Sequence, residues 1–441
     1  MILLLVLVVV VALMVISAAK FHFHPFLSLL LAALVMGFAG GLDATQVTTV
    51  LMNGFGKTLG SIGIIIAFGT IIGAYLEKSG GALAMANRVL GWVGRKNSVL
   101  AMNLTGFIVS IPVFCDSGFV ILSPLNKALS RKSGIPLVVL GISLAAGLYA
   151  THVFVPPTPG PLAAAAALDA DLGLVILLGL AVAVPVSLAG FLWAKRIEKK
   201  GGEAVADSGK DAVAHPERLP SATLSFAPIV VPILLIALRS VTGYPTHPFG
   251  QGTLAAVFLF AGHPVIALFA GVFLAFALKK KEEKETHFHW VTKGLKDAGI
   301  IILITGAGGA FGAILRATGL GDIIGDAFSG MQAGLLLPFL IAALLKTAQG
   351  SSTVAIITTA AIAAPLLEPF GLATPAGRAL TVLATGAGAM TVSHLNDSFF
   401  WVVAQFTGLD TATALRTQTV STLFQGVTGI SIILVLGWVL L

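Results

Sequence analysis

The chain has 441 residues, of which 57% are hydrophobic and only 10% are charged, and its mean hydropathy is +0.99. This composition excludes an ordinary soluble globular protein and leaves a lipid bilayer as the plausible solvent. The net charge of +7 does not indicate nucleic-acid binding, because the basic residues cluster in loops beside apolar runs, where they act as topology signals.

The first apolar run, 2–18, approaches the length needed to cross a bilayer. It is similar to a secretory signal, but no positive charge follows Met1 and Lys20 comes after the run. We therefore expect a retained first span. The single cysteine, Cys115, permits no disulfide within the chain and is expected to be a free, buried thiol.

Two segments are too long for one crossing and too short for two. Residues 98–127 would form a helix about 45 Å long, whereas two crossings need about 40 residues. A re-entrant hairpin fits better, with arms 98–114 and 119–127 and a tip from Cys115 to Gly118 at mid-depth. The same argument predicts a second hairpin over 334–368, entered from the opposite side, with its tip from Gln349 to Thr353.

Two other segments, 135–168 and 377–408, are predicted to be helices broken at mid-depth. In the first, four prolines between Pro156 and Pro161 cannot continue a helix, because each removes a donor and clashes with the preceding turn. The second has no prolines, and its break is inferred from the polar run 391–398.

Two charged loops set the orientation. They lie within 195–224 and 279–297, and two apolar segments near 225–241 and 250–278 separate them. An even number of crossings puts both loops on one side, and their lysines and arginines make that side the cytoplasm. We expect a multi-pass protein of the inner membrane.

An internal repeat relates residues 1–194 to residues 225–441, with 195–224 as a charged linker. Four short matches occur in order at an offset of about 240 residues. With about five crossings and one hairpin in each half, the odd count predicts an all-α membrane fold of two inverted repeats. The matching pairs are 69–74 with 306–313, 117–121 with 352–356, 151–152 with 393–394 and 168–169 with 409–410.

The hairpin tips and helix breaks are the predicted binding site, because irregular backbone at membrane depth should line an enclosed or wet cavity. Free N–H groups at the start of the following short helices favour a small organic anion. For each hydroxyl, the alternative is a helix cap bonded to backbone. The candidate substrate-binding residues are Ser117, Gly118, His152, Thr158, Pro159, Gly160, Lys346, Gln349, Gly350, Ser351, Ser352, Thr353, His394 and Asn396.

The charged residues within apolar segments have two interpretations each. Asp116 and Asp397 are candidates for proton coupling, or else helix caps or ionised partners of a buried cation. Lys346 is a candidate counter-charge for the substrate, unless it extends to an interface. His152 and His394 occupy equivalent repeat positions and could titrate or simply bond to backbone.

No motif indicates an enzyme, a metal site or a cofactor. His287 and His289 lie in a charged loop without cysteine or acidic ligands nearby, so we expect solvated surface there. The sequence has neither a Walker-type phosphate loop nor a dinucleotide fingerprint, so transport is expected to use an ion gradient.

Three stretches carry a family resemblance: 111–125, the Pro-Pro-Thr-Pro-Gly-Pro run 156–161, and the Ser-His-Leu-Asn-Asp-Ser-Phe-Phe-Trp run 393–401. Together with nearly the whole chain, they resemble the gluconate:proton symporter family. The resemblance implies proton-coupled symport of gluconate or a related sugar acid or hydroxy monocarboxylate. It also implies the ion transporter superfamily, with paired hairpins, a homodimer and elevator-type movement against a scaffold near 44–56 and 225–278.

Other functions stay open. The family also handles D-serine, and sodium-coupled or exchange transport of another small organic anion is an alternative. A membrane-embedded sensor or enzyme would bind a ligand in the same cavity without moving it. A passive channel is disfavoured, because tips that enter from opposite sides suit alternating access to one occluded site.

Overall fold

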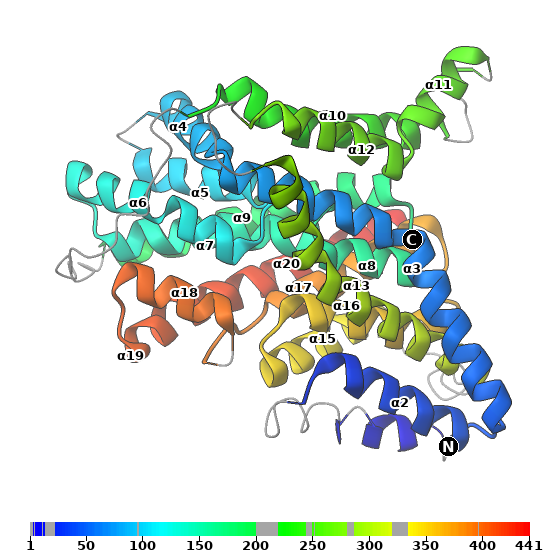
Figure 1. The fold of residues 1–441 in the computed structure, drawn as a ribbon. Coiled ribbons are helices and arrows are strands. Elements are labelled where there is room, and N and C mark those ends of the chain that lie inside the picture. The colour runs from blue at the N-terminus through cyan, green and yellow to red at the C-terminus, as the bar shows by residue number, and fades with distance from the viewer. Residues whose placement is uncertain are drawn as a thin grey trace.

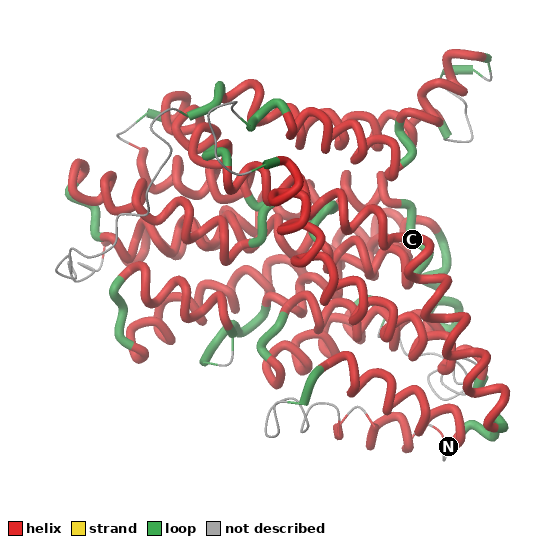
Figure 2. The backbone as a smooth tube through the Cα atoms, viewed as in Figure 1, coloured by secondary structure: helices red, strands yellow, loops and turns green. Residues whose placement is uncertain are grey.

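The computed structural model describes residues 3, 5–10, 12–13, 23–94, 97–199, 219–243, 249–250, 252–279, 286–319, 334–395 and 397–441. These residues form helices and no strand (Figure 2), which confirms the predicted all-α class. Within them, five helices are long and apolar enough to cross a bilayer, or seven if each bent pair counts as one span. In the predicted first span, 2–18, residues 2, 4, 11 and 14–18 lie outside the described residues.

The helices follow one another with short connections. The first half contains α2 (Pro25–Ala39), α3 (Ala44–Lys78), α4 (Gly81–Val93), α5 (Ser98–Val109), α6 (Cys115–Ser133), α7 (Leu137–Phe154), α8 (Pro159–Ala167) and α9 (Leu172–Lys199). The second half contains α10 (Ala222–Thr242), α11 (Thr253–Ala261), α12 (Pro264–Phe276), α13 (His287–Ala317), α15 (Leu336–Gln349), α16 (Ser352–Ala363), η2 (Ala364–Leu366), α17 (Pro375–Met390), α18 (Ser398–Thr407), α19 (Thr411–Ala414), η3 (Leu415–Thr419) and α20 (Val420–Leu440).

The helices pack in two groups (Figure 1). The long helices α3 and α13 lie antiparallel against each other, and with α2, α10 and α12 they make what we call the frame. Helices α5 to α9, α15 to α18 and α20 make what we call the inner bundle. Its centre is α7, whose residues from Val138 to Phe154 are all buried.

Glycines let the helices of the inner bundle approach closely. A Cβ atom on Gly147 of α7 would lie 2.0 Å from the carbonyl oxygen of Asn103 on α5, and one on Gly106 would lie 2.5 Å from the carbonyl oxygen of Leu144. Because lipid gives no hydrophobic drive for helices to associate, such close backbone contact is a main source of packing energy.

Replacing Gly147 with alanine should therefore destabilise the inner bundle by about 2 kcal/mol, because backbone on both sides has to move apart. The measurement is the midpoint of thermal unfolding in detergent. Gly299 of α13 is the matched control, since a Cβ there meets no atom within 4 Å and G299A should be neutral or slightly stabilising. Equal midpoints for the two variants would contradict the packing argument.

The first predicted hairpin differs from its expected bounds. Helix α5 ends at Val109, α6 begins at Cys115, and the non-helical connection is 110–114. The predicted tip residues, Cys115 to Gly118, are instead the first turn of α6. Pro112 explains the shift, since it cannot continue a helix and disfavours helical backbone in the residue before it. Helix α6 then runs past residue 127 to Ser133, where Gly134 caps it at φ 71°.

The other interrupted segments have narrow breaks. Helices α7 and α8 are separated by residues 155–158 only, because Pro159 stands at the first helical position, where a missing N–H is tolerated. Helices α15 and α16 meet at Gly350 and Ser351, with Gly350 at φ 80°. Helix α17 ends at Met390 and α18 begins at Ser398. The inversion of one half relative to the other stays a prediction.

Two segments of the second half differ in shape from what the sequence predicts. The apolar run 250–278 is bent, because α11 and α12 meet at an angle of 66° at Gly262 and His263, where Pro264 starts a new helix. The predicted loop 279–297 is helical from His287 onwards, where α13 begins. Contacts to α3 hold this turn: Lys293 Nζ lies 3.0 Å from the Glu77 carboxylate, and the Trp290 ring packs on Tyr75.

Candidate functional site

A cavity of about 220 Å³ lies where four interrupted segments meet. The first turn of α6, the last two turns of α7, the connection between α15 and α16 with the start of α16, and the start of α18 all contribute to its wall. Three helices therefore begin at this cavity, and the first N–H groups of each have no partner within their own helix. Its lining residues are Phe114, Cys115, Asp116, Tyr149, His152, Gly350, Ser351, Ser352, Thr353, Asp397, Ser398 and Phe399.

Asp397 and Lys346 form a buried ion pair beside the cavity. Their charged atoms lie 2.6 Å apart, and the side chains are 5% and 0% exposed. Lys346 also donates to the carbonyl oxygen of Gly350, and the Ser393 hydroxyl donates to the same Asp397 oxygen. The other Asp397 oxygen accepts from the Phe399 backbone N–H at 3.1 Å, so Asp397 caps α18. Asp397 is thus the partner of a buried cation, which was one of its predicted alternatives.

Asp116 is less completely bonded. Its Oδ2 accepts a hydrogen bond from the Ser398 hydroxyl at 3.2 Å, which joins the first tip to the second break. Its Oδ1 is buried and has no hydrogen-bond partner among the described residues. A buried carboxylate oxygen without a partner carries a large desolvation penalty, which a proton or a ligand can relieve. Among the described residues, this oxygen is the one carboxylate oxygen of the cavity wall that is buried without a hydrogen-bond partner.

The two equivalent histidines lie in different surroundings. His152 is buried and lines the cavity, its ring centroid is 6.0 Å from that of Phe114, and its Nδ1 has no partner within the described part of the chain. His394 lies outside the cavity wall, and its Nε2 is 3.0 Å from the carbonyl oxygen of Thr347. Because a carbonyl oxygen only accepts, Nε2 of His394 carries the proton.

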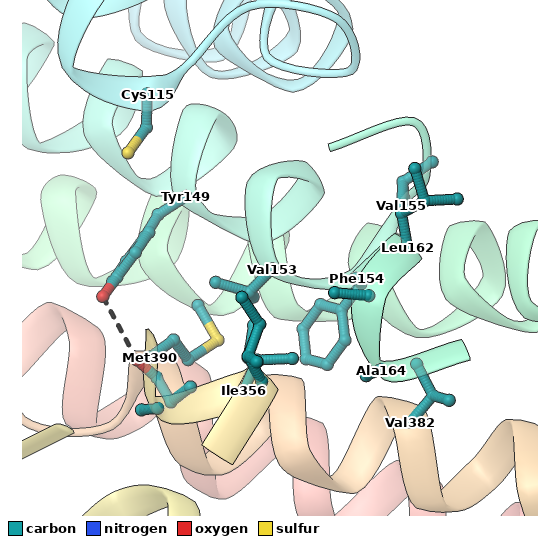
Figure 3. Close-up of a cluster of buried hydrophobic side chains, with 14 of the residues drawn as sticks. Cys115, Tyr149, Val153, Phe154, Val155, Leu162, Ala164, Ile356, Val382 and Met390 are labelled. Carbon is teal, nitrogen blue, oxygen red and sulfur yellow. Dashed lines mark hydrogen bonds between the residues drawn. The ribbon is translucent and has the colours of Figure 1, made fainter. Parts of the chain in front are cut away.

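The hydroxyls of the second tip are held by α7 and by their own helix. The Tyr149 hydroxyl is 2.6 Å from Ser352 Oγ. It also donates to the Ala389 carbonyl oxygen at 3.4 Å, the bond that is dashed in Figure 3. The Ser351 hydroxyl accepts from the Val354 N–H at 3.3 Å and so caps α16. The ammonium of Lys346 lies 5.8 Å from the centre of the Tyr149 ring. Tyr149 therefore connects the second tip to the centre of the inner bundle.

Comparison with known sequences decides the family. The profile of the GntP family permeases matches residues 1–439. The chain belongs to this family. It is 35% identical over 435 residues to a gluconate permease of Pseudomonas aeruginosa, covering 97% of this chain and 96% of that one. It is also 35% identical over 445 residues to the Gnt-II system L-idonate transporter of Escherichia coli, covering 99% of each chain.

Solved structures share the fold of this permease. MtrF of Neisseria gonorrhoeae superposes with a TM-score of 0.68 over 95% of this chain and 96% of that chain, at 16% identity. The Alcanivorax borkumensis YdaH transporter superposes with a TM-score of 0.58 over 90% of each chain, at 17% identity. The permease is therefore a multi-pass membrane protein built on a transporter fold.

The cavity of the permease brings together seven of the sixteen residues predicted to form its site. Asp116, His152, Asp397 and the four residues from Gly350 to Thr353 line it. Lys346 does not, since it is fully buried behind Asp397. The Gln349 side chain and Asn396 lie outside the described residues.

The remaining predicted residues pack beside the cavity instead of lining it. The Thr158 hydroxyl donates to the Val155 carbonyl oxygen at 2.6 Å, as expected of a local cap. A Cβ on Gly160 would lie 3.0 Å from Ile356, so Pro159 and Gly160 start α8 against α16. Ser117 and Gly118 follow Asp116 in α6, and Gly118 faces Leu148 of α7.

Three polar residues of the site were missed from the sequence. Tyr149 stands one turn before His152 on the same face of α7, and that spacing was the available signal. Ser393 and Ser398 lie within the polar run that predicted the second break, but their bonds to Asp397 and Asp116 depend on how that run folds.

Proposed function

We propose that this permease is a secondary transporter that carries gluconate or a related hydroxylated monocarboxylate together with a proton across the inner membrane. The named relatives support a sugar-acid substrate. The convergence of α6, α16 and α18 supports an anionic one, since the N-termini of three helices, with the positive ends of their dipoles, lie at one cavity. Ser352, Thr353 and Ser398 supply hydroxyls for a polyhydroxylated chain.

Asp116 is the observation on which proton coupling rests. Its carboxyl lines the same cavity as the proposed anion, and its Oδ1 has no partner within the described residues. Two negative charges in one small cavity repel each other, so the substrate binds best when Asp116 is protonated. By linkage, the bound anion in turn favours the proton on Asp116. Asp397 is less suited to this role, because Lys346 already neutralises it.

We propose further that the inner bundle moves against the frame to alternate access. Glycines of both long frame helices face the inner bundle and support this. Gly69 and Gly73 of α3 lie against Pro157 and Pro112, and Gly308 and Gly312 of α13 lie against Ile357 and Ala361. Because glycine has no side chain, the frame presents few ridges at these positions that would interlock with the inner bundle and oppose its sliding. This movement, in a homodimer held by the frame, is the elevator mechanism that the family resemblance implies.

Uptake of labelled gluconate into proteoliposomes tests the proposed function. With an inward proton gradient, we expect accumulation above equilibrium that stops when a protonophore removes the gradient. Competition by unlabelled sugar acids, hydroxy acids and D-serine ranks the substrates. Accumulation that follows sodium and ignores pH would contradict proton coupling. Binding of gluconate without counterflow under any gradient would indicate a sensor or an enzyme instead.

A further inference from the structure

A second and larger cavity lies between the frame and the inner bundle. It has a volume of about 1140 Å³, and we call it the vestibule. The frame contributes α3 and α13 to its wall, and the inner bundle contributes α8, η2 and the first turn of α17. Its charged lining residues are Lys57, Asp169, Arg316, Glu368 and Arg378.

The two frame cations in the vestibule have no partner among the residues that the structure describes. Neither Lys57 nor Arg316 forms a hydrogen bond or ion pair with any described residue, and both side chains are exposed to the cavity. Arg378 differs, because its guanidinium donates to the carbonyl oxygens of Ala373 and Leu168 at 2.8 and 2.7 Å. Within the described part of the chain, the vestibule therefore contains two cationic groups with no bonded partner that would compete with an anion.

The acidic residues of the vestibule do not neutralise these cations. The Asp169 side chain is 98% exposed, and its carboxylate makes a weak contact, at 4.0 Å, with Arg378 and not with Lys57 or Arg316. Glu368 is exposed and is not paired with Lys57 or Arg316. Within a concave wall of low dielectric, the uncompensated cations focus their field into the cavity and raise the local concentration of small anions.

No residue lines both the vestibule and the site cavity, and apolar residues that we call the seal lie at the edge of the vestibule. Ile65, Leu162 and Leu172 line the vestibule and also a gap of only about 10 Å³, which is room for roughly one water. The far side of this gap includes Pro112, and Phe114, two residues further along the first tip, lines the site cavity. The vestibule and the site cavity thus have separate walls in this conformation, and the seal reaches the first tip at Pro112.

We propose that the vestibule is a low-affinity anion site, in which Lys57 and Arg316 bind a small carboxylate before it passes the seal. A guanidinium can bind a carboxylate through two parallel hydrogen bonds, and the lysine adds a second positive charge. That this carboxylate is the transported sugar acid rests on the proposed function. The charged central loops follow the end of α9 and precede the start of α13, whereas the vestibule lies at the start of α9 and the end of α13. With these loops on the cytoplasmic side, the vestibule opens to the opposite side of the membrane.

The electrostatic part of this proposal can be tested without any substrate. Asn53 lines the vestibule one turn before Lys57, so N53C, with Cys115 replaced by serine, places a single thiol there. The readout is the ratio of its reaction rates with an anionic and a cationic methanethiosulfonate reagent. Exchanging both Lys57 and Arg316 for glutamine should lower this ratio about tenfold at low ionic strength, whereas E368Q should raise it.

The double variant K57R/R316K conserves both charges and is the matched control. Its reagent ratio should equal that of the chain with Lys57 and Arg316, which separates loss of charge from misfolding.

A second experiment measures transport in the chain without N53C. There the double glutamine variant should raise the KM for gluconate about tenfold at low ionic strength, with Vmax unchanged, and the difference in KM should shrink in high salt. An unchanged reagent ratio would overturn the vestibule site, even if KM moved. If the unaltered permease takes up no gluconate, the proposed function fails, while the reagent ratio still decides whether the vestibule concentrates anions.

Discussion

Replacing Asp116 with asparagine should uncouple transport from the proton gradient without stopping substrate exchange. If one proton moves with each monocarboxylate, a pH gradient of one unit supplies about 1.4 kcal/mol per substrate molecule, which supports roughly tenfold accumulation of the substrate. The amide of D116N keeps the shape and the bond to Ser398 but cannot take up a proton. We expect accumulation in proteoliposomes to fall to the equilibrium level while counterflow of labelled gluconate continues.

The same variant should also change how binding depends on pH. In the unaltered permease, gluconate affinity should fall at alkaline pH, because the ionised Asp116 repels the anion. In D116N this dependence should be lost, with the affinity fixed near its acidic value. Calorimetric titration of gluconate into the purified unaltered permease and into purified D116N, at acidic and at alkaline pH, measures these affinities. A retained pH dependence, or normal accumulation, would show that another group carries the proton.

Asp410 provides the matched control for D116N. It caps α19 at a fully exposed position, and hydrogen bonds from the Thr413 backbone N–H and hydroxyl hold the pKa of its carboxyl below the usual value. A lowered pKa keeps this group ionised through the physiological range, and it could lose its charge only as the pH falls through that lowered value. D410N should therefore leave both accumulation and its pH dependence near those of the unaltered chain.

The helix breaks could be predicted because their signals are local. Proline, glycine and short polar runs interrupt a helix wherever they occur, so the breaks near Pro156, Gly350 and Ser393 were evident from the sequence. Their lengths were overestimated, since a proline in the first turn of a helix is tolerated and Pro159 already belongs to α8. The bend at His263 was missed, because the apolar run around it satisfies the length of a single span.

The pairing of side chains could not be predicted, because it depends on how distant segments meet. Lys346 and Asp397 are each recognisable as buried charges, but their contact requires the end of α15 to reach the connection before α18. The bond from Tyr149 to Ser352 likewise spans the two halves of the chain. Sequence periodicity gives the face of a helix on which a residue stands, but not which residue faces it across a helix contact.

Replacing Lys346 with methionine should destabilise the permease by about 3–5 kcal/mol, because it leaves the Asp397 carboxylate buried without its cation. Adding D397N to K346M removes both charges and should recover a large part of the loss, since a buried pair costs much of its attraction in desolvation. The measurement is the thermal midpoint in detergent for both single variants and the double variant, which together form a double-mutant cycle. Single variants no less stable than the double variant would contradict the ion pair.

Gluconate binding by the stable double variant then separates two roles for Lys346. If the ion pair holds the second tip against the second break, the double variant should bind gluconate within about tenfold of normal affinity, because the helix N-termini still recognise the anion. If Lys346 is the counter-charge of the substrate, binding should be lost although the protein is folded. The structure favours the first outcome, since the ammonium of Lys346 is fully buried, already bonded to Asp397 and Gly350, and absent from the cavity wall.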